Sequence, residues 1–600
     1  MKTEKQKAVR FLAITLAILL LSSIFVWGFQ TDWGRVEIRR LNLTNEDGTK
    51  LSTLLYLPKN ATEETPAPLA IIYHGRSNQG HSNDTWSMEL ARRGYVVLSP
   101  DLTGGGESYT YSGGYFNGGR NTQGLAMINL AKNMKFVDQE HINLIGYSLG
   151  TNTVTGVADL DPESINSNLD VFGPFMVVRS LKSVKAQMEE YGIHTGIIKA
   201  DCDQYDFSHI GDALACRTKV SEALELDHVI DANSETSFGD AVFVYTEISD
   251  AMHQTGNISG SAITAILQFE NRFNSAPVAL ADNDQVWLWQ QIFSGIACVD
   301  MMFCLAAALN LLMQTEFFGA MAVERKPRKE LRGAKNWCID ILFTFVIPAA
   351  LFITVSTWGM KWFSGSFLTS DNLNGIMLWL LVAMFGIGTV RTLIKHNKRK
   401  KAGEAIEAAD YCLAAPGEKF NKSNVGKSLL LGIAVTAFFG LWMTAMEAYL
   451  GIDYQVWNLS TYLKPSGLRV IRAIPYMIII FIVMFSGNIN QRVLPSTGNE
   501  KKDMWIAVAV NTVLTASALF FLLLVQYGGS FLYGTGETFF KGNGGSTGAL
   551  DFAFGYCYMM GGTTGVVTYF YRKYGNVLPA VVTCSIFAGL FTFLSMTTVV

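Results

Sequence analysis

The sequence contains little charge and few cysteines or histidines. Of its 600 residues, 16% are charged and 49% are apolar, and the mean hydropathy is +0.23. It has eight cysteines and eight histidines, and no group of them has the spacing of metal ligands. The sequence therefore predicts neither a metal nor another cofactor. A chain this long with so little charge is expected to contain more than one domain and to include long apolar segments.

A concentrated basic face is also lacking in the part of the chain that reads as soluble. Residues 30–285 contain 18 Lys and Arg against 33 Asp and Glu, a net charge of −15. The remainder contains 29 basic and 17 acidic residues, a net charge of +12. Since proteins that bind nucleic acid neutralise phosphates with a basic surface, the composition argues against nucleic acid as a partner.

Long uncharged runs account for the high hydropathy, and the first lies near the N-terminus. The run from Phe11 to Phe29 is long enough to cross a hydrocarbon core of about 30 Å. Four basic residues precede it: Lys2, Lys5, Lys7 and Arg10. Residues 1–29 are therefore expected to form a transmembrane anchor with a cytoplasmic N-terminus. A cleaved signal peptide is the alternative, but the run is long and lacks the small-residue cleavage pattern.

Residues 286–600 are expected to form an all-α membrane domain with about eight transmembrane helices. The candidate spans are 287–313, 337–358, 375–393, 428–450, 470–488, 504–527, 549–570 and 577–598. The connections expected to be cytoplasmic are basic: Glu324–Lys335, Lys395–Lys401, Asn490–Lys502 and Tyr571–Gly575. Basic loops stay on the cytoplasmic side, so residues 30–285 and the C-terminus are expected outside the cytoplasm.

Three ionisable residues fall within the candidate spans: Asp300, Glu447 and Arg472. Charge inside a membrane is costly and often marks a functional site. The alternative is that these side chains form buried polar pairs or lie near an interface.

Residues 30–285 alternate between strand-like and helix-like segments. Residues 68–75 and 95–101 are short apolar runs typical of buried parallel strands. Helical patterns lie between and after them. This alternation predicts a doubly wound, mostly parallel sheet with helices on both faces.

One strand-like segment leads into Gly-Tyr-Ser-Leu-Gly at residues 146–150. A serine nucleophile needs a sharp turn that holds its hydroxyl away from its own backbone. Gly146 and Gly150 let strand and helix approach closely around Ser148. The helix expected after Ser148 would direct backbone N–H groups at a developing oxyanion.

Four segments in order resemble the α/β-hydrolase superfamily, near its esterase, dienelactone-hydrolase and serine-peptidase-like branches. The resemblance covers residues 36–275, about two-fifths of the chain. Its motifs are YHGRSNQG (73–80), SPDLTGGGES (99–108), GYSLG (146–150) and ISDAMHQTG (248–256). The resemblance implies an α/β-hydrolase domain over residues 30–285, fused to the membrane domain.

The resemblance also implies roles for particular residues. Ser148 would be the nucleophile, and His253, in the loop after the last strand, would be its general base. The acid should follow the penultimate strand, where Asp203 is the first choice. Three other carboxylates remain alternatives: Asp201, Asp206 and Asp231.

The turn at His74 and Gly75 matches the family's oxyanion turn, in which His74 has a structural role. The backbone N–H groups of Leu149 and Arg76 would bind the oxyanion. The Arg76 side chain would either contact substrate or remain on the surface.

Two of the eight cysteines, Cys202 and Cys216, lie in residues 30–285. An oxidising compartment would permit a disulfide that braces the loop of Asp203. Two separate buried thiols are the alternative.

Together these features predict a membrane-bound serine hydrolase outside the cytoplasm. Its expected substrates are carboxylic esters of small molecules, acyl lipids or cell-envelope polymers, cleaved through an acyl-enzyme. One alternative is a serine peptidase of the same fold. Another is a transporter or lipid-handling membrane protein with an accessory hydrolase domain.

Overall fold

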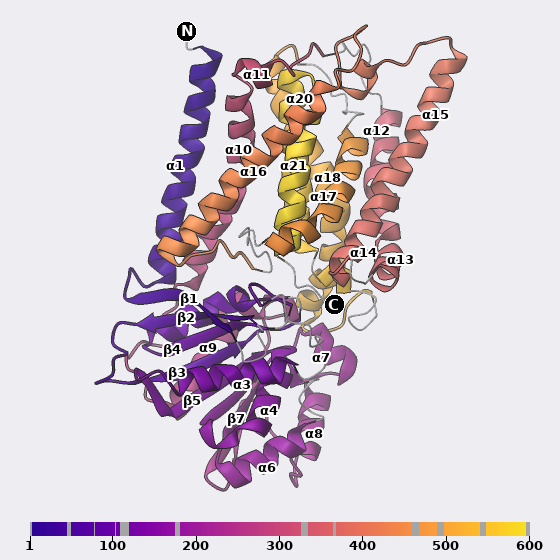
Figure 1. Ribbon diagram of the computed structural model, residues 1–600. Coiled ribbons are helices and arrows are strands. Elements are labelled where there is room, and N and C mark those ends of the chain that lie inside the picture. Colours follow the sequence, from indigo (N-terminus) through magenta and orange to yellow (C-terminus); the bar gives the residue numbers. More distant parts are fainter. Residues whose placement is uncertain are drawn as a thin grey trace.

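The computed structural model describes residues 3–595, except 45–49, 77, 103, 109–118, 175–179, 326–333, 364–367, 458–466, 489–496, 541–547 and 552. The chain folds into two parts (Figure 1). A sheet domain spans residues 36–273, and a helical domain combines helix α1 with residues 287–594. The N-terminus lies at the end of the helical domain farthest from the sheet.

The sheet domain is built on one nine-stranded sheet. The strands are β1 Val36–Thr44, β2 Lys50–Pro58, β3 Ala67–Tyr73, β4 Val96–Asp101, β5 Val137–Tyr147, β6 Ser167–Val171, β7 His194–Ala200, β8 Ser234–Phe238 and β9 Ala241–Ile248. Their order in the sheet is β1-β2-β4-β3-β5-β6-β7-β9-β8. Strands β4, β3, β5, β6, β7 and β9 run parallel. Strands β1, β2 and β8 add antiparallel pairs at the two edges. The predicted mostly parallel sheet is confirmed.

Helices cover both faces of this sheet. They are α2 Asp84–Arg92, α3 Gly119–Ala131, α4 Gly150–Leu160, α6 Leu181–Tyr191, α7 Gln204–His209, α8 Ala213–Ala223 and α9 Gly260–Phe273. Every residue of β3 is buried, and successive β3 side chains point to opposite faces. Ala70 and Ile72 therefore pack in one core with α2 and α9, while Leu69 and Ile71 pack in another with α3 and α4.

The helical domain stands on the sheet domain and contains long, mostly apolar helices together with shorter ones (Figure 1). They are α1 Glu4–Gln30, α10 Trp287–Leu312, α11 Glu316–Gly319, α12 Ala334–Ile341, α13 Ile347–Trp362, α14 Asp371–Leu380, α15 Ile387–Lys401, α16 Ser423–Leu450, α17 Gly467–Asn488, α18 Glu500–Tyr533, α19 Gly548–Asp551, α20 Phe554–Tyr574 and α21 Leu578–Leu594. Helix α1 packs against α10, where the rings of Phe25 and Phe293 stack with their centroids 4.5 Å apart.

Within the described residues, seven helices are long and apolar enough to cross a membrane: Glu4–Gln30, Trp287–Leu312, Leu342–Trp362, Asp371–Lys401, Ser423–Leu450, Arg469–Gly487 and Glu500–Tyr533. Two of them contain a π-helical turn, at Leu342–Val346 and Leu381–Gly386. Helix α21 is apolar but shorter. All nine segments expected to span the membrane are largely helical, and seven of them meet this criterion.

Two elements differ from the sequence-based expectation. The eighth expected span, 549–570, is divided into α19 and α20, so Asp551 belongs to a separate short helix. Strand β8 was not expected, because four of its five residues are polar and it pairs at the edge of the sheet.

A buried polar network joins the two domains beside β1. The Arg40 guanidinium donates to Asp101 Oδ2 at 2.8 Å and to Glu447 Oε1, on α16, at 2.5 Å. Glu447 is therefore half of a buried ion pair, one of the two roles expected for charge in the spans. Asp300 accepts a contact from the Cys304 thiol at 3.6 Å. Burying an arginine is costly unless its charge is paired, and here each domain contributes one carboxylate to Arg40.

The close packing around β3 and α4 gives a stability prediction. A Cβ on Gly150 would lie 2.0 Å from the carbonyl oxygen of Tyr73, a backbone atom that cannot move aside cheaply. Gly150→Ala is expected to destabilise the sheet domain by about 3 kcal/mol and lower its Tm by roughly 6–12 °C. Thermal unfolding of the purified protein in detergent measures this.

Gly260→Ala is the control, because a Cβ at the first residue of α9 meets only Gln285 Oε1 at 3.6 Å and one ring carbon at 4.0 Å. Equal Tm values for the two variants would contradict the packing argument.

Candidate active site

Ser148 lies in a sharp turn between β5 and α4. Its φ is +52°, a left-handed conformation that costs free energy for any residue with a side chain. The turn closes with a hydrogen bond from Thr151 N–H to the Ser148 carbonyl at 3.0 Å. A Cβ on Gly146 would lie 2.6 Å from Thr151 N. Both glycines of the motif are therefore required by close backbone approach, and the turn holds the Ser148 side chain above the end of the sheet.

His253 lies beside Ser148 and begins the short 3-10 helix η3 His253–Ile258, after strand β9. The Ser148 hydroxyl donates to His253 Nε2 at 2.8 Å. The other ring nitrogen, Nδ1, donates to Asp203 Oδ2 at 2.7 Å. This second bond fixes the tautomer, because Nδ1 carries the proton and the Nε2 lone pair faces the serine.

Asp203 is held by the start of α7. It is the N-cap residue of that helix, and its Oδ1 accepts backbone N–H groups of Tyr205 at 2.8 Å and Asp206 at 3.1 Å. Its Oδ2 remains for His253. The side chain is fully buried. N-capping thus fixes one carboxylate oxygen to the helix and leaves the other directed at the imidazole.

The other three carboxylates considered from the sequence are placed differently. Asp201 Oδ1 accepts from Lys199 Nζ at 3.1 Å. Asp206 lies within α7, and its backbone N–H binds Asp203. Asp231 is exposed, and its carbonyl accepts the Ser234 hydroxyl. The structure brings Asp203 into contact with His253 through a 2.7 Å hydrogen bond.

The expected oxyanion turn lies against the serine. A Cβ on Gly75 would lie 3.2 Å from both Ser148 Cβ and the Tyr147 carbonyl oxygen. His74 Nδ1 donates to the Gly75 carbonyl at 2.8 Å, and His74 Nε2 accepts the Leu102 N–H at 2.9 Å. Burial, and secondarily the charge of Arg120, lowers the pKa of His74 to about 3. A His74 that is neutral near pH 7 therefore bonds both the turn at Gly75 and the loop after β4.

The two residues expected to supply oxyanion N–H groups flank this turn. Leu149 follows the serine at the N-cap position of α4, so the N-terminus of that helix lies behind Ser148. Arg76 follows Gly75, and its guanidinium donates to Asp371 Oδ2, on α14, at 2.7 Å. The Arg76 side chain is therefore paired with the helical domain.

Cys202 and Cys216 are separate thiols in the structure. The Cys202 thiol contacts the carbonyls of Ser249 and Ser530, each at 3.4 Å. Cys216 is buried in the core between α6, α8 and the last strands. The disulfide considered from the sequence is not formed, and the loop of Asp203 is braced by the helical domain instead.

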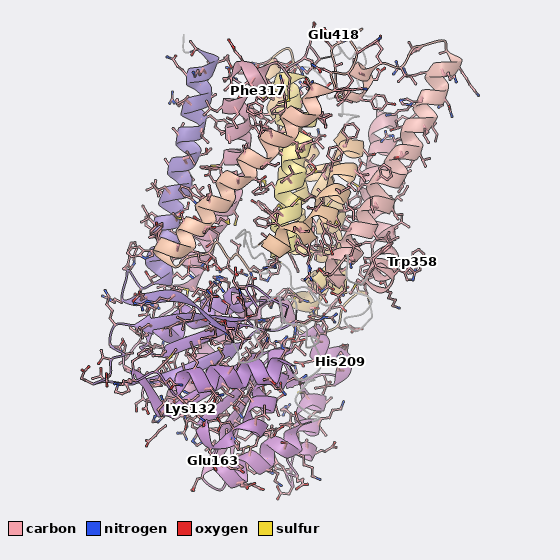
Figure 2. All side chains as sticks on the ribbon, in the orientation of Figure 1. Lys132, Glu163, His209, Phe317, Trp358 and Glu418 are labelled. Atoms are coloured by element: carbon pink, nitrogen blue, oxygen red, sulfur yellow. The ribbon has the colours of Figure 1, made fainter. Side chains whose placement is uncertain are left out.

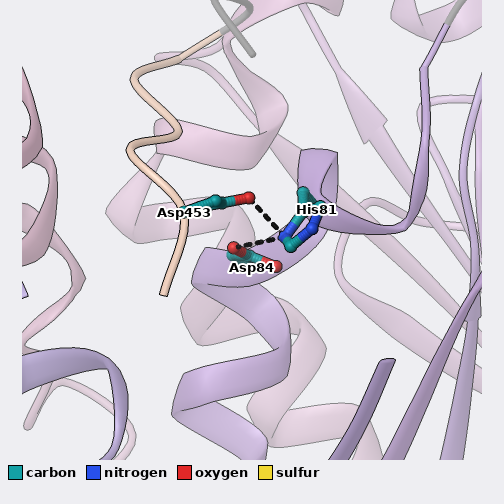
Figure 3. A group of neighbouring side chains, drawn as sticks. All are labelled: His81, Asp84 and Asp453. Carbon is teal, nitrogen blue, oxygen red and sulfur yellow. Dashed lines mark ion pairs between the residues drawn. The ribbon is translucent and has the colours of Figure 1, made fainter. Parts of the chain in front are cut away.

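A cluster that sequence spacing did not predict joins His81, Asp84 and Asp453 (Figure 3). His81 Nδ1 contacts the Asp453 carboxylate and lies 3.5 Å from Asp84 Oδ2. His81 Nε2 lies 2.5 Å from Arg40 Nη2, which can only donate. Nε2 must therefore accept, and Nδ1 carries the proton. Because a cation would need the Nδ1 lone pair, this cluster fits a hydrogen-bond network better than a metal site.

Several residues that contact the segments around Asp203 and His253 come from the helical domain, and no local sequence signal pointed to them. Asp551, on α19, accepts hydroxyl hydrogen bonds from Tyr205 and Tyr527. Trp457 Nε1 donates to the carbonyl of Gln254, next to His253, at 2.6 Å. Their partner Tyr205 belongs to the sheet domain. Its position two residues after Asp203 is the one signal in the sequence that could have indicated a role beside the acid.

No family model matches the chain, and no curated protein matches it. Its sheet domain is similar to solved hydrolase structures at low identity. A dienelactone hydrolase-like promiscuous phosphotriesterase, P91, from metagenomic libraries is 12% identical, with 40% of this chain and 100% of that chain covered and a TM-score of 0.30. Est1E from Butyrivibrio proteoclasticus is 15% identical, with 39% and 96% covered and a TM-score of 0.27.

Dipeptidyl peptidase 4 from Porphyromonas gingivalis is 14% identical, with a TM-score of 0.28. The match covers 36% of this chain and spans only 33% of that peptidase's length. These scores are low, so the assignment to an α/β-hydrolase-like fold rests on this chain's own strand order and on its turn at Ser148.

The arrangement can activate a serine hydroxyl for attack on a carbonyl or phosphoryl group. His253 Nε2 can take the hydroxyl proton, and Asp203 then stabilises the imidazolium.

If so, Asp203→Asn should lower the rate at which Ser148 reacts with a fluorophosphonate by roughly 10³–10⁴-fold, because the amide favours the wrong tautomer. Time-resolved labelling of the purified protein measures this rate.

Asp201→Asn is the matched control. Asp201 lies two residues away and is paired with Lys199, so labelling should remain near the wild-type rate. A similar loss of labelling rate in both variants would show that Asp203 is not the particular carboxylate that orients His253.

Proposed function

We propose that this protein is a membrane-bound serine hydrolase that cleaves carboxylic esters through an acyl-enzyme, with Ser148 as nucleophile, His253 as general base and Asp203 as the orienting acid. The observation that carries the proposal is the unbroken chain of hydrogen bonds from Ser148 Oγ through His253 to Asp203, at 2.8 and 2.7 Å. The left-handed turn at Ser148 supports it, since strained backbone of this kind concentrates at functional sites.

Location in a membrane is supported by the helical domain. Its seven long apolar helices match the thickness of a bilayer. Exposed aromatic residues lie towards both of its ends, Phe317 at one and Trp358 at the other (Figure 2), as in the aromatic belts of membrane proteins.

An orientation with the sheet domain outside the cytoplasm is supported by the charge distribution. Helix α15 ends in Lys398, Arg399, Lys400 and Lys401, at the same end of the helical domain as the N-terminus (Figure 1). The sheet domain lies at the opposite end. Since basic segments remain in the cytoplasm, the active site faces the extracytoplasmic side.

Acyl lipids are favoured as substrates by a cavity in the helical domain. It has a volume of about 740 Å³ and is lined by α10, α18 and α20 with almost entirely apolar side chains. Leu524 lines it and lies one turn before Tyr527 on α18. Tyr527 in turn receives a long hydrogen bond, 3.4 Å, from Gln254 beside His253. One end of this cavity, at Leu524, is thus linked through Tyr527 to the loop of His253, which favours lipid esters over water-soluble ones.

Labelling of intact cells with a membrane-impermeant fluorophosphonate tests the proposal. The wild type should be labelled, because Ser148 is activated and faces outward, and Ser148→Ala should lose the signal entirely. Ser183→Ala is the control, since this half-buried serine donates to the Asp159 carboxylate and not to a histidine. Labelling that appears only after lysis would reverse the orientation, and wild-type labelling in Ser148→Ala would refute the nucleophile.

Hydrolysis assays then separate esters from amides. The purified protein in detergent should cleave p-nitrophenyl esters, with higher kcat/KM for longer acyl chains, and should leave matched p-nitroanilides largely intact. Faster cleavage of the anilides would favour a serine peptidase.

A further inference from the structure

The helical domain contacts the loops that follow four strands of the sheet, all at the edge where the active site lies. After β3, Arg76 pairs with Asp371 at 2.7 Å. After β4, the Gly106 carbonyl accepts from Arg469 at 2.8 Å. After β7, the Cys202 thiol contacts the Ser530 carbonyl. After β9, Gln254 contacts Trp457 and Tyr527. The helical domain thus contacts the loop that carries Asp203, the loop that carries His253 and the turn at Gly75.

Asp551 makes the most specific of these contacts between the two domains. One carboxylate oxygen accepts the hydroxyl of Tyr205, from the sheet domain, and the other accepts the hydroxyl of Tyr527, from α18. Asp551 and Tyr527 are both buried. A buried carboxylate is costly unless it is well hydrogen-bonded, and charge-assisted hydrogen bonds are the stronger ones. Asp551 therefore fixes the Tyr205 hydroxyl firmly to the helical domain.

Tyr205 in turn contacts both partners of Ser148. Its backbone N–H donates to Asp203 Oδ1 at 2.8 Å. Its ring lies against the imidazole of His253, with the ring centroids 4.6 Å apart and the planes at 52°. The imidazole also stacks on Tyr147, at 5.6 Å and 24°, and the Tyr147 hydroxyl donates to the His253 carbonyl. Of these two aromatic neighbours, Tyr147 is held by the sheet domain itself and Tyr205 by Asp551.

We propose that Asp551 is a positioning residue of the active site: by binding the Tyr205 hydroxyl it sets the ring that orients His253, so the serine is fully reactive only when the helical domain is docked. This rests on the proposed function of Ser148, His253 and Asp203. The residue acts through Tyr205 and takes no part in proton transfer. The helical domain is thereby a component of the hydrolase as well as its anchor.

Replacement of Asp551 by Asn tests the proposal. An amide lacks the charge that strengthens both hydrogen bonds, and its NH₂ group can only donate, so the hold on the Tyr205 hydroxyl is weakened. A small misplacement of a catalytic group can cost about 10²-fold in rate. Asp551→Asn is expected to lower kcat and the fluorophosphonate labelling rate roughly 10–100-fold. KM for a p-nitrophenyl ester should change less than about threefold, because the substrate site is intact.

Tyr205→Phe removes the same hydrogen bond and keeps the ring, so it should reproduce the loss of kcat. The double variant Tyr205→Phe/Asp551→Asn should be no slower than either single variant, because the two residues act through one interaction. Tyr527→Phe leaves the Tyr205–Asp551 bond in place and should have a smaller effect. Asp300→Asn, which removes a buried carboxylate bonded to Cys304 within the helical domain, should retain wild-type kcat.

The outcomes separate this inference from the proposed function. If the wild type is neither labelled nor active on esters, the proposed serine hydrolase function is refuted, whatever Asp551 does. If the wild type is active and folded Asp551→Asn keeps wild-type kcat, or if the losses in the double variant multiply, the positioning role is refuted. If Asp551→Asn does not fold by its Tm, Tyr205→Phe decides: a folded Tyr205→Phe with wild-type kcat overturns the proposal, and a 10–100-fold loss supports it.

Discussion

The candidate active site depends on a single backbone conformation, the left-handed turn at Ser148. A serine has no intrinsic preference for a φ of +52°, so the surrounding structure must enforce it. Gly146 and Gly150 allow α4 to lie against β5 and β3 within distances that a methyl group would not permit. The turn at Gly75 packs on Ser148 from the other side. The strain is stored where three segments meet, and it presents the hydroxyl to His253.

His253 shows a second constraint, which is that its ring is oriented by both domains. Asp203 fixes one nitrogen, and N-capping of α7 fixes Asp203 in turn. Tyr147 and Tyr205 flank the ring. The sheet domain provides every group of the hydrogen-bonded chain, yet the helical domain holds the loops on which those groups sit. The sheet domain carries the groups of the hydrogen-bonded chain, and its contacts with the helical domain hold those groups in position.

The sequence predicted those features that depend on neighbours along the chain. The apolar runs at 68–75 and 95–101 predicted buried strands, and the Gly-x-Ser-x-Gly spacing predicted the turn at Ser148. Asp203 could be ranked first among four carboxylates only by the order of elements, because its contact with His253 spans 50 positions. Asp551 could not be predicted at all. It lies 346 positions from Tyr205, and the break between α19 and α20 that places it falls inside an apolar pattern that reads as one span.

The separation between contacting residues in the sequence has a consequence for biosynthesis. Arg40 is made 407 positions before Glu447, and Tyr205 is made 346 positions before Asp551. At ~5–20 residues per second, the ribosome needs roughly 20–70 s to reach Asp551 after Tyr205. Until Glu447 and Asp551 have been made, the sheet domain carries Arg40 without one of its two carboxylates and Tyr205 without the residue that holds its hydroxyl. On the proposed function, the order of synthesis thus delays a fully aligned nucleophile until the helices that hold Tyr205 have been made.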